Sequence, residues 1–360
     1  MIGLIAKKRL IYLLSLVPII ASSCKKEEVM ITDEQPHGVR LEVPANFPKY
    51  VDDLDNPLTA EGIELGRLLF FDTRLSGNNK LSCGSCHQQN IAFSDAIALN
   101  NIGVSGKTLD RHSPALINLA WANNGLFWDG GVTNLESQAF APLTSADEMH
   151  QNLTELEYEL KQVPDYVKKF KLVFNEDIKS ANVVKALSQF QRTLISGNSK
   201  YDKYIRKEEG ATLSSLEING LNLINSKCKS CHAGELFTDN GYHNNGLDAT
   251  FNDEHEGIYQ GRYRITHNLA DMGKFKTPTL RNIMLTAPYM HDGRLKTIDD
   301  VLEHYNTGLK NSETIDQLLF QNNNQLGIPI TSNEKEAIKA FLHALTDNDF
   351  ISNKKFSNPN

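Results

Sequence analysis

Two short stretches decide the fold: Cys83-Gly84-Ser85-Cys86-His87 and Cys228-Lys229-Ser230-Cys231-His232. In both, two thiols stand three positions apart and an imidazole follows directly. This CxxCH pattern is the attachment signature of c-type haem. The thiols reach two vinyl groups on one edge of the porphyrin, and the imidazole turns beneath the ring to bind iron. We therefore expect two covalently bound c-type haems, with His87 and His232 as the proximal iron ligands.

Zinc binding and dithiol redox chemistry are the alternatives for paired cysteines. Two pairs that lie 145 residues apart, each with its own histidine, fit haem better than a zinc site. A thioredoxin-like pair follows a strand. Cys228 instead follows a stretch with helical spacing of apolar residues, for which Ser215 is the predicted N-cap. The pattern therefore favours haem over both alternatives.

The N-terminus has the pattern of an export signal. Basic residues 7–9 precede an apolar run over 10–20, and small residues separate this run from Cys24. The run is too short to span a bilayer, and a cysteine in this place resembles the lipobox of bacterial lipoproteins. Ordinary secretion is the alternative. We predict a lipoprotein signal peptide over 1–23, a lipid anchor at Cys24, a tether over 24–48 and a location in the cell envelope, in the periplasm.

The composition is that of a globular protein. Of the 360 residues, 40% are hydrophobic and 22% are charged, which excludes collagen-like, coiled-coil and wholly disordered chains. The net charge of −7 becomes −10 without the three basic residues of the signal peptide. Nucleic-acid binding needs clustered positive charge, so we expect no nucleic-acid partner, whereas the negative charge favours a basic protein partner.

Helical patterns dominate the folded part. Thr59, Ser180 and Thr331 are the predicted N-caps of three amphipathic helices, and Glu334 completes a capping box with Thr331. No long stretch alternates polar and apolar residues, so we expect little sheet. The predicted fold is mainly α: two tandem cytochrome c-like domains, each around one covalent haem, over residues 49–208 and 209–350, with a polar tail over 351–360.

The two halves share more than the CxxCH motifs. Ser113-Pro114-x-Leu116-x-Asn118 followed by Trp128-Asp129-Gly130 matches Thr277-Pro278-x-Leu280-x-Asn282 followed by His291-Asp292-Gly293. An apolar residue stands six positions after each aspartate. This repeat indicates a duplicated module in which each copy binds one haem.

The repeat also allows residues on the distal sides of the two haems to be compared position by position. Tyr305 lies thirteen residues after Asp292, and the residue thirteen after Asp129 is Pro142. A phenolate ligates iron and a proline cannot. We therefore predict one six-coordinate haem for electron transfer and one haem with the vacant position that peroxide chemistry needs. The alternatives are that Tyr305 is an ordinary core or surface residue and that Met272, Met284 or Met290 is the ligand.

On these residues the chain resembles the bacterial di-haem cytochrome c peroxidases, and among them the MauG branch, over about residues 50–346. Further motifs carry the resemblance: Arg111–Leu116, Phe127–Gly130, Gln138, Glu148, Phe237–Asn240, Pro278–Asn282 and Ala287–Gly293.

The resemblance implies roles for single residues of the distal sites. His87 would hold the peroxidatic haem, with Gln138, Pro142 and Glu148 lining its distal pocket. Tyr305 stands at the family's sixth-ligand position of the second haem, which is Met in the peroxidases proper and Tyr in the MauG branch.

Further roles follow from the same resemblance. Trp128 would lie between the haems and assist electron transfer, and Arg281 would contact a cofactor. A calcium ion held by the carbonyl groups of Thr286 and Pro288 and by an asparagine would bridge the domains. His112 stands at the place of that asparagine, which puts the calcium ion in question.

A second departure concerns the first haem. Many family members carry a removable distal histidine some sixteen residues after the first motif, where this chain has Gly103. The first haem is therefore expected to be open without prior reduction.

The predicted function is reduction of hydrogen peroxide at the first haem. Glu148 would move the proton from the near to the far peroxide oxygen. Electrons would come through the second haem from a cytochrome c or a cupredoxin. The alternatives are a MauG-like enzyme that oxidises side chains of a partner protein and a non-enzymatic electron-transfer cytochrome. A homodimer is compatible with the resemblance.

Overall fold

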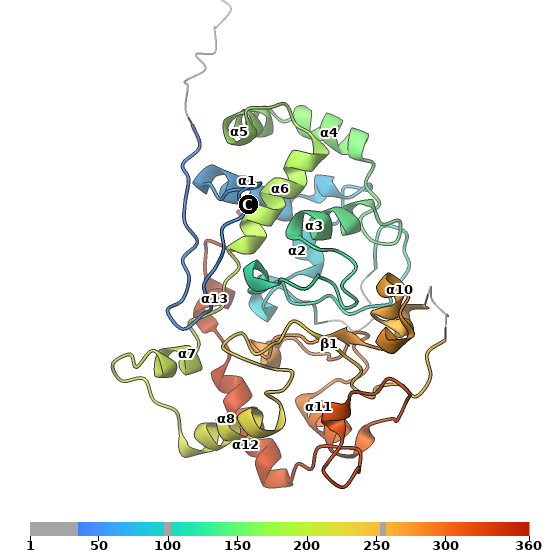
Figure 1. Ribbon diagram of the computed structural model, residues 1–360. Coiled ribbons are helices and arrows are strands. Elements are labelled where there is room, and N and C mark those ends of the chain that lie inside the picture. Colours follow the sequence, from blue (N-terminus) through green and yellow to red (C-terminus); the bar gives the residue numbers. More distant parts are fainter. Residues whose placement is uncertain (1–34, 97–101, 253–256, 360) are drawn as a thin grey trace, which may run out of the picture. The chain divides into compact units, whose positions relative to one another are not determined.

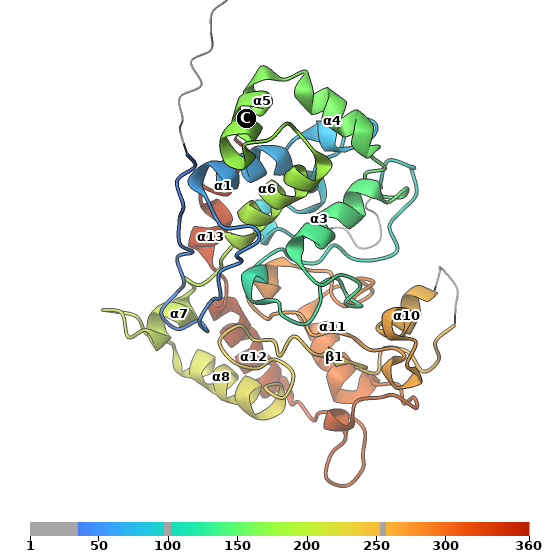
Figure 2. The same cartoon turned by 45° about the horizontal axis from the view of Figure 1, so that its top comes forward.

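The computed structural model describes residues 35–96, 102–252 and 257–359. The predicted signal peptide, Cys24 and the first part of the predicted tether lie outside the described residues. The fold is mainly α, as predicted, and residues 35–360 form one compact unit (Figures 1 and 2). The helices are α1 Ala60–Phe70, α2 Cys83–Cys86, α3 Leu135–Thr144, α4 Leu153–Lys161, α5 Pro164–Phe174, α6 Ser180–Arg192, α7 Lys200–Ile205, α8 Ser215–Lys227, α10 Tyr263–Thr266, α11 Ile298–Glu303, α12 Ser332–Ala344 and α13 Asn348–Ser352.

Sheet is scarce in the described part of the chain. One antiparallel pair, β1 Tyr242–His243 and β2 Phe275–Lys276, forms the only named ladder there. No helix among the described residues is both long and apolar enough to cross a membrane.

Side-chain caps fix where the main helices begin. Thr59 accepts a hydrogen bond from Gly62 at the start of α1, and Thr331 and Glu334 form the predicted capping box at α12. Two predicted caps were wrong by one residue. Ser214, not Ser215, caps α8, because its hydroxyl pairs with the backbone of Glu217.

The second wrong cap is at α6. Ser180 is the first residue of this helix and Lys179 is its N-cap. The backbone N–H of Ser180 donates to Glu157 at 2.7 Å. A neighbouring helix therefore satisfies a donor that an ordinary cap side chain would satisfy.

The same close helix pair lies at the centre of each half. α1 packs on α6, and α8 packs on α12 (Figures 1 and 2). A Cβ at Gly66 of α1 would lie 2.0 Å from the carbonyl oxygen of Ala186, and a Cβ at Gly220 of α8 would lie 2.0 Å from that of Ala337. Only glycine permits this approach. Phe190 and Phe341, one turn farther along α6 and α12, are fully buried in the two hydrophobic cores.

Loops at matching positions of the two halves also have the same backbone conformation. Asn118 and Asn282 both have left-handed backbone, with φ of 57° and 56°, and each starts a 3₁₀ turn. Isolated bridges join Leu126 to Val132 and Tyr289 to Leu295 at matching places. The internal repeat seen in the sequence is therefore a repeat of backbone conformation.

A fully buried ion pair links the two halves. Arg281 donates to both carboxylate oxygens of Asp202 at 2.8 Å, and both side chains are 0% exposed. Burial alone would raise the pKa of Asp202, but the hydrogen bonds and charge of Arg281 hold it below its ordinary value. The ion pair of Asp202 with Arg281 therefore stabilises the fold at pH values above the ordinary aspartate pKa. This stabilisation is lost as the pH falls through the lowered pKa of Asp202.

The terminal segments also join the halves. Phe47, near the end of the predicted tether, is buried beside Trp121 and Leu236. At the other end, Phe350 of α13 packs into the core of the first half, and Phe356 lies against it. Parts of both segments therefore belong to the folded body.

We expect Asp202→Asn to lower the free energy of unfolding of the haem-loaded protein by about 3–5 kcal/mol, because it leaves the Arg281 guanidinium buried without an anion. Urea titration followed by circular dichroism measures the change. Lys203→Ala is the control, since it removes one partner of an exposed pair with Asp349 and should cost less than about 1 kcal/mol. Equal losses in the two variants would contradict the assignment.

Candidate functional site

Both CxxCH histidines are held in the same way. Nδ1 of His87 lies 2.9 Å from the carbonyl oxygen of Phe93, and Nδ1 of His232 lies 3.2 Å from that of Phe237. A carbonyl oxygen only accepts, so Nδ1 carries the proton and Nε2 keeps its lone pair. Burial lowers the pKa of both imidazoles and favours this neutral form. Each Nε2 is therefore prepared to bind a metal.

The thiols beside these imidazoles are reduced and largely buried. None of the four is in a disulfide. Burial raises the pKa of Cys83 to about 12 and that of Cys86 and Cys228 to about 11. Within the described ranges, no three side chains of His, Cys, Asp or Glu gather as a metal site. Two thiols and one imidazole in each motif are fewer than the four ligands of a structural zinc site, which agrees with haem attachment.

The second motif opens into a large, mostly apolar cavity. Cys228, Cys231 and His232 line it at one end, and Tyr305 and Met290 also face it. The space between its atoms amounts to about 1420 Å³, part of it open to solvent. Leu302, Ile338 and Leu342 supply apolar wall. Three attachment groups and an apolar slot fit a haem, and they place Tyr305 in the same cavity as the proximal imidazole.

A charged cluster lies beside this cavity. His243 lies between Asp316 and Asp239, with Nδ1 paired to the first and Nε2 at 2.8 Å from Oδ2 of the second. The hydrogen bond with Asp316, helped by further bonds to Cys231 and Asp239, raises the pKa of His243 to about 11. The imidazole is therefore a cation at neutral pH. The second haem site thus has the His243 cation beside it, with its charge balanced by Asp239 and Asp316.

The helix α3 carries Gln138 and Pro142, two residues predicted for the distal side of the first haem. Asn134 caps this helix, and Leu135, Ala139 and Leu143 face the core, whereas Gln138 and Pro142 lie one turn apart on a neighbouring stripe. The Oε1 atom of Gln138 is buried, and no hydrogen-bond partner for it exists in the described part of the chain. A buried acceptor without a partner is costly. It marks a place where a ligand or a water would bind.

Glu148 approaches the first haem motif from the loop after α3. Burial raises the pKa of its carboxyl, and after burial and the charge of Asp95, the charge of Glu148 adds to the raised pKa of Cys86. The backbone carbonyl of Glu148 accepts a hydrogen bond of 2.7 Å from Val104. The Glu148 carboxyl is therefore within electrostatic range of Cys86, and its place at the distal side of the first haem stays a prediction. Glu148 and Pro142 do not line the cavity that contains Gln138.

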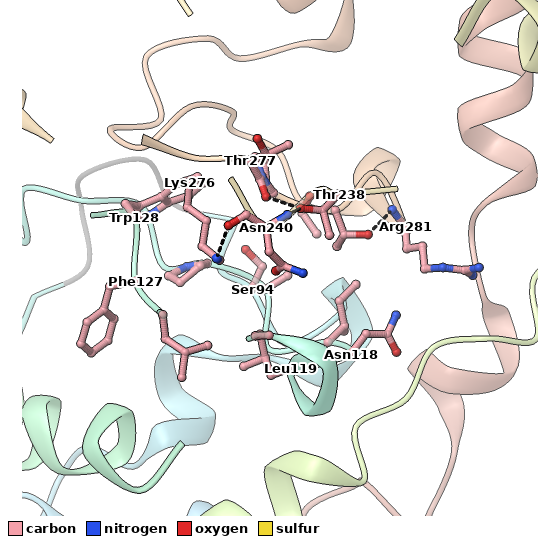
Figure 3. Close-up of a pocket in the computed structure, with 18 of the residues that line it drawn as sticks. Ser94, Asn118, Leu119, Phe127, Trp128, Thr238, Asn240, Lys276, Thr277 and Arg281 are labelled. Carbon is pink, nitrogen blue, oxygen red and sulfur yellow. Dashed lines mark hydrogen bonds between the residues drawn. The ribbon is translucent and has the colours of Figure 1, made fainter. Parts of the chain in front are cut away.

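That cavity lies between the two halves (Figure 3). Trp128 lines both this cavity and the second haem cavity, and its indole N–H donates to the carbonyl of His112 at 2.8 Å. Lys276 also lines both, with Nζ at 3.1 Å from Asn240 O and 3.2 Å from Asn124 O. Burial lowers the pKa of Lys276 to about 8. Trp128 therefore lines the second haem cavity and the cavity between the halves, and because Cys83, Cys86 and His87 do not line the latter, its place between the two haems stays a prediction.

Arg281 lines this cavity, with its guanidinium directed to Asp202. Its Nε donates to the carbonyl of Glu235 at 2.8 Å. Contact with a cofactor stays a prediction for this residue.

Thr286 and Pro288 line the same cavity as His112. Calcium takes six to eight oxygen ligands. The His112 imidazole offers none and is paired with Asp95 at 2.9 Å. These residues therefore supply only part of an oxygen ligand set, and a calcium ion here stays a prediction.

Three residues of these sites were not singled out from the sequence: His243, Lys276 and Asn245, which lines the second cavity. His243 follows the motif aspartate Asp239 by four positions, and this spacing is a weak signal. Lys276 directly precedes the repeated Thr277-Pro278, whereas Asn245 has no such marker.

Comparison with known proteins agrees with this geometry. Residues 60–210 match the family model described as di-haem cytochrome c peroxidase. The methylamine utilization protein MauG of Methylorubrum extorquens is 36% identical over 294 residues, which cover 81% of this chain and 79% of that protein. The cytochrome c551 peroxidase of Nitrosomonas europaea is 33% identical over 304 residues, 84% of this chain and 85% of that one.

Solved structures show the same fold. A MauG-like protein associated with microbial copper homeostasis superimposes with a TM-score of 0.81 at 33% identity, covering 89% of this chain and 99% of that chain. The diheme peroxidase BthA from Burkholderia thailandensis gives a TM-score of 0.69 at 22% identity, covering 88% and 92%. With two matching haem motifs in a duplicated module, the chain belongs to the di-haem cytochrome c peroxidase and MauG family, and it is an oxidoreductase with two c-type haems.

Proposed function

We propose that the protein reduces hydrogen peroxide to water at its first haem, with electrons relayed through the second haem from a small redox protein. One observation carries this proposal: the two modules share a backbone but differ at matched distal positions. Gln138 and Pro142 of α3 correspond in the repeat to Val301 and Tyr305, and the latter two line the second haem cavity. A phenol faces the second site, and a proline, which cannot ligate iron, stands at the first.

The bound haem supplies a ferric iron that accepts peroxide and electrons. Around it, Glu148 is suited to proton movement, because burial raises the pKa of its carboxyl towards the working pH. The carboxylate would take the proton of the near peroxide oxygen and deliver it to the far one. Gln138, with its unpartnered Oε1, would accept a hydrogen bond from the bound peroxide.

The backbone of Gly103 and Val104 packs against the Asp147–Glu148 segment. A Cβ at position 103 would lie 1.5 Å from the carbonyl oxygen of Asp147, so no larger residue fits there unless the loop shifts. The side chain of Lys107 forms an ion pair with Asp147 at 3.3 Å, so a second contact joins the same two segments. We propose that this packing keeps the distal side of the first haem free of a protein ligand.

The electron route would pass through Trp128, which lines both cavities, as Tyr289 also does. The donor would be a cytochrome c or a cupredoxin. The negative net charge of the chain favours a donor with a basic contact surface.

A MauG-like activity is the second candidate, in which the oxidised di-haem state modifies side chains of another protein. Tyr305 favours it, because a phenolate ligand lowers the reduction potential of the second haem and makes that haem a poorer acceptor from a donor cytochrome. Turnover of peroxide with reduced cytochrome separates the two candidates.

We further propose that the mature protein lies in the periplasm on a lipid anchor at Cys24. The support is the export pattern of residues 1–24 and the chemistry of haem attachment, which takes place outside the cytoplasm.

The ferric protein tests the asymmetry directly. We expect its electron paramagnetic resonance spectrum to contain one high-spin signal, from the first haem, and one low-spin signal, from the second. Peroxide should change the absorption spectrum without prior reduction. Two low-spin signals and no response to peroxide would identify an electron conduit instead.

Glu148→Gln should reduce kcat/KM for peroxide by about 10²-fold or more, the usual scale for a general acid–base group. In the natural protein, kcat/KM should fall on the acid side at a pH above the ordinary glutamate pKa of about 4.3, because protonation removes the base. The variant should lack this acid limb. Unchanged turnover at full haem occupancy would refute the role.

Gly103→Ala should displace the Asp147–Glu148 backbone and lower peroxide turnover by about 10²-fold, the scale of a misplacement of about 1 Å. Gly38→Ala is the matched control, because its Cβ would meet no atom within 4 Å and its backbone is not left-handed. Stopped-flow mixing with peroxide measures both variants. Equal rates in the two would show that position 103 does not hold Glu148.

A further inference from the structure

Helices α7 and α13 occupy matching places in the two modules. α7 follows α6 and α13 follows α12, and α6 and α12 are the matched helices of the two central pairs. In the link before α7, the backbone N–H of Ser196 donates to the side chain of Asn118 at 2.9 Å. Before α13, the backbone N–H of Asp347 donates to the side chain of Asn282, the matched residue of the repeat, at 2.8 Å. The links are thus anchored alike, and they touch each other, because the hydroxyl of Ser196 donates to the carboxylate of Asp347 at 3.2 Å.

Each of these two helices packs on the other module (Figures 1 and 2). Phe350 of α13 is buried in the hydrophobic core of the first half, where its ring meets that of Phe93 edge to face, with the centroids 5.7 Å apart. Tyr201 of α7 is buried in the core of the second half, where its ring meets that of Phe237 in the same way at 5.4 Å. The two modules have therefore exchanged their terminal helices.

The exchanged helix α13 also contacts the segment that follows the first haem motif. The side chain of Gln89, two residues after His87, donates to the carbonyl oxygen of Phe350 at 3.2 Å. The same side chain donates to the carbonyl oxygen of Asn353 at 2.8 Å. α13 is thus joined to the motif segment and, through the ring of Phe93, to the turn that accepts the hydrogen bond of the proximal imidazole.

The second haem motif has a corresponding contact with α7. The phenol of Tyr201 donates at 3.1 Å to the carboxylate of Glu235, which stands three residues after His232. The ring of Tyr201 packs on Phe237, whose carbonyl oxygen lies 3.2 Å from Nδ1 of His232. In both halves, the turn that holds the proximal imidazole is therefore covered by a helix from the other module.

This packing bears on the strength of the proximal ligand. Nδ1 of His87 donates to the carbonyl oxygen of Phe93 at 2.9 Å. Phe93 has left-handed backbone, a conformation that persists only where the surrounding structure fixes it. A hydrogen bond at Nδ1 raises the basicity of a metal-bound imidazole, and a more basic ligand favours ferric over ferrous iron. Loss of the ring packing therefore weakens the hydrogen bond and raises the midpoint potential of the haem.

We propose that the proximal ligand of each haem is positioned by the terminal helix of the other module. Phe350 of α13 is the positioning residue for His87. Tyr201 of α7 is the corresponding residue for His232. The inference goes beyond the proposed function, because it requires the two histidines as iron ligands and is the same for a peroxidase and for a MauG-like enzyme.

The test compares Phe350→Leu with Tyr201→Leu in the di-haem protein. A redox titration followed by absorption and electron paramagnetic resonance measures its two midpoint potentials. We expect each variant to raise one potential and to leave the other unchanged, and the two variants to raise different potentials. The expected rise is at least about threefold in the ferric–ferrous equilibrium of that haem, which is about 28 mV for one electron.

Phe170→Leu is the matched control. Phe170 is fully buried in the same core as Phe350, but its ring meets those of Tyr166 and Phe174. This variant should lose stability and keep both potentials. Gln89→Leu removes two hydrogen bonds to α13 without a change in the core, and it should raise the same potential as Phe350→Leu.

Unchanged potentials in Phe350→Leu and Gln89→Leu at full haem occupancy would overturn the proposal. An equal rise in Phe170→Leu would also overturn it, because the shift would then follow from any loss of core packing. A rise of the same potential in Phe350→Leu and Tyr201→Leu would show that the two helices do not serve opposite haems. Should Phe350→Leu fail to retain both haems, the result for Gln89→Leu decides.

Discussion

The hydrogen bond from each proximal imidazole to a downstream phenylalanine carbonyl is the constraint on which the rest of the structure depends. Phe93 and Phe237 both have left-handed backbone, with φ of 56° and 51°, a conformation that costs energy in a residue with a side chain. Both rings are buried, at 0% and 4% exposure, and their burial offsets that cost. The turn thereby points its carbonyl at the imidazole and fixes which nitrogen is left for iron. Each haem site is thus coupled to the hydrophobic core of its own module.

The local parts of this design could be predicted from the sequence. The CxxCH motifs, the capping box at Thr331 and each copy of the repeated motif, Trp128-Asp129-Gly130 and His291-Asp292-Gly293, depend on residues a few positions apart. Patterns of this kind can be read from the sequence, because the side-chain and backbone groups that interact are only a few residues apart. The proposed distal contrast between Pro142 and Tyr305 rests on the same repeat, because residues at matched spacing are expected at matched places.

The long-range parts could not be predicted in this way. Asp202 and Arg281 are 79 positions apart, and no pattern in either stretch names the other as its partner. The same holds for Phe47 beside Trp121 and for Asn245 beside Met290. Nothing near His243 in the sequence indicates its ion pair with Asp316, which lies 73 positions away. Such contacts arise where two modules or two loops close on each other, and their chemistry depends on burial that the sequence does not record.

The two modules also show how one fold carries different helices at matched positions. α3 and α11 begin with equivalent side-chain caps, Asn134 and Thr297, and then diverge. α3 continues through Pro142 to Thr144, whereas α11 ends at Glu303 and widens into a π-helical turn that carries Tyr305. Turns of this type are frequent at functional sites because they redirect one side chain without disturbing the helix before it. The Gly66 and Gly220 helix contacts are the same in both modules. The helix packing is therefore shared by the two modules, which differ in the few residues that follow the equivalent caps.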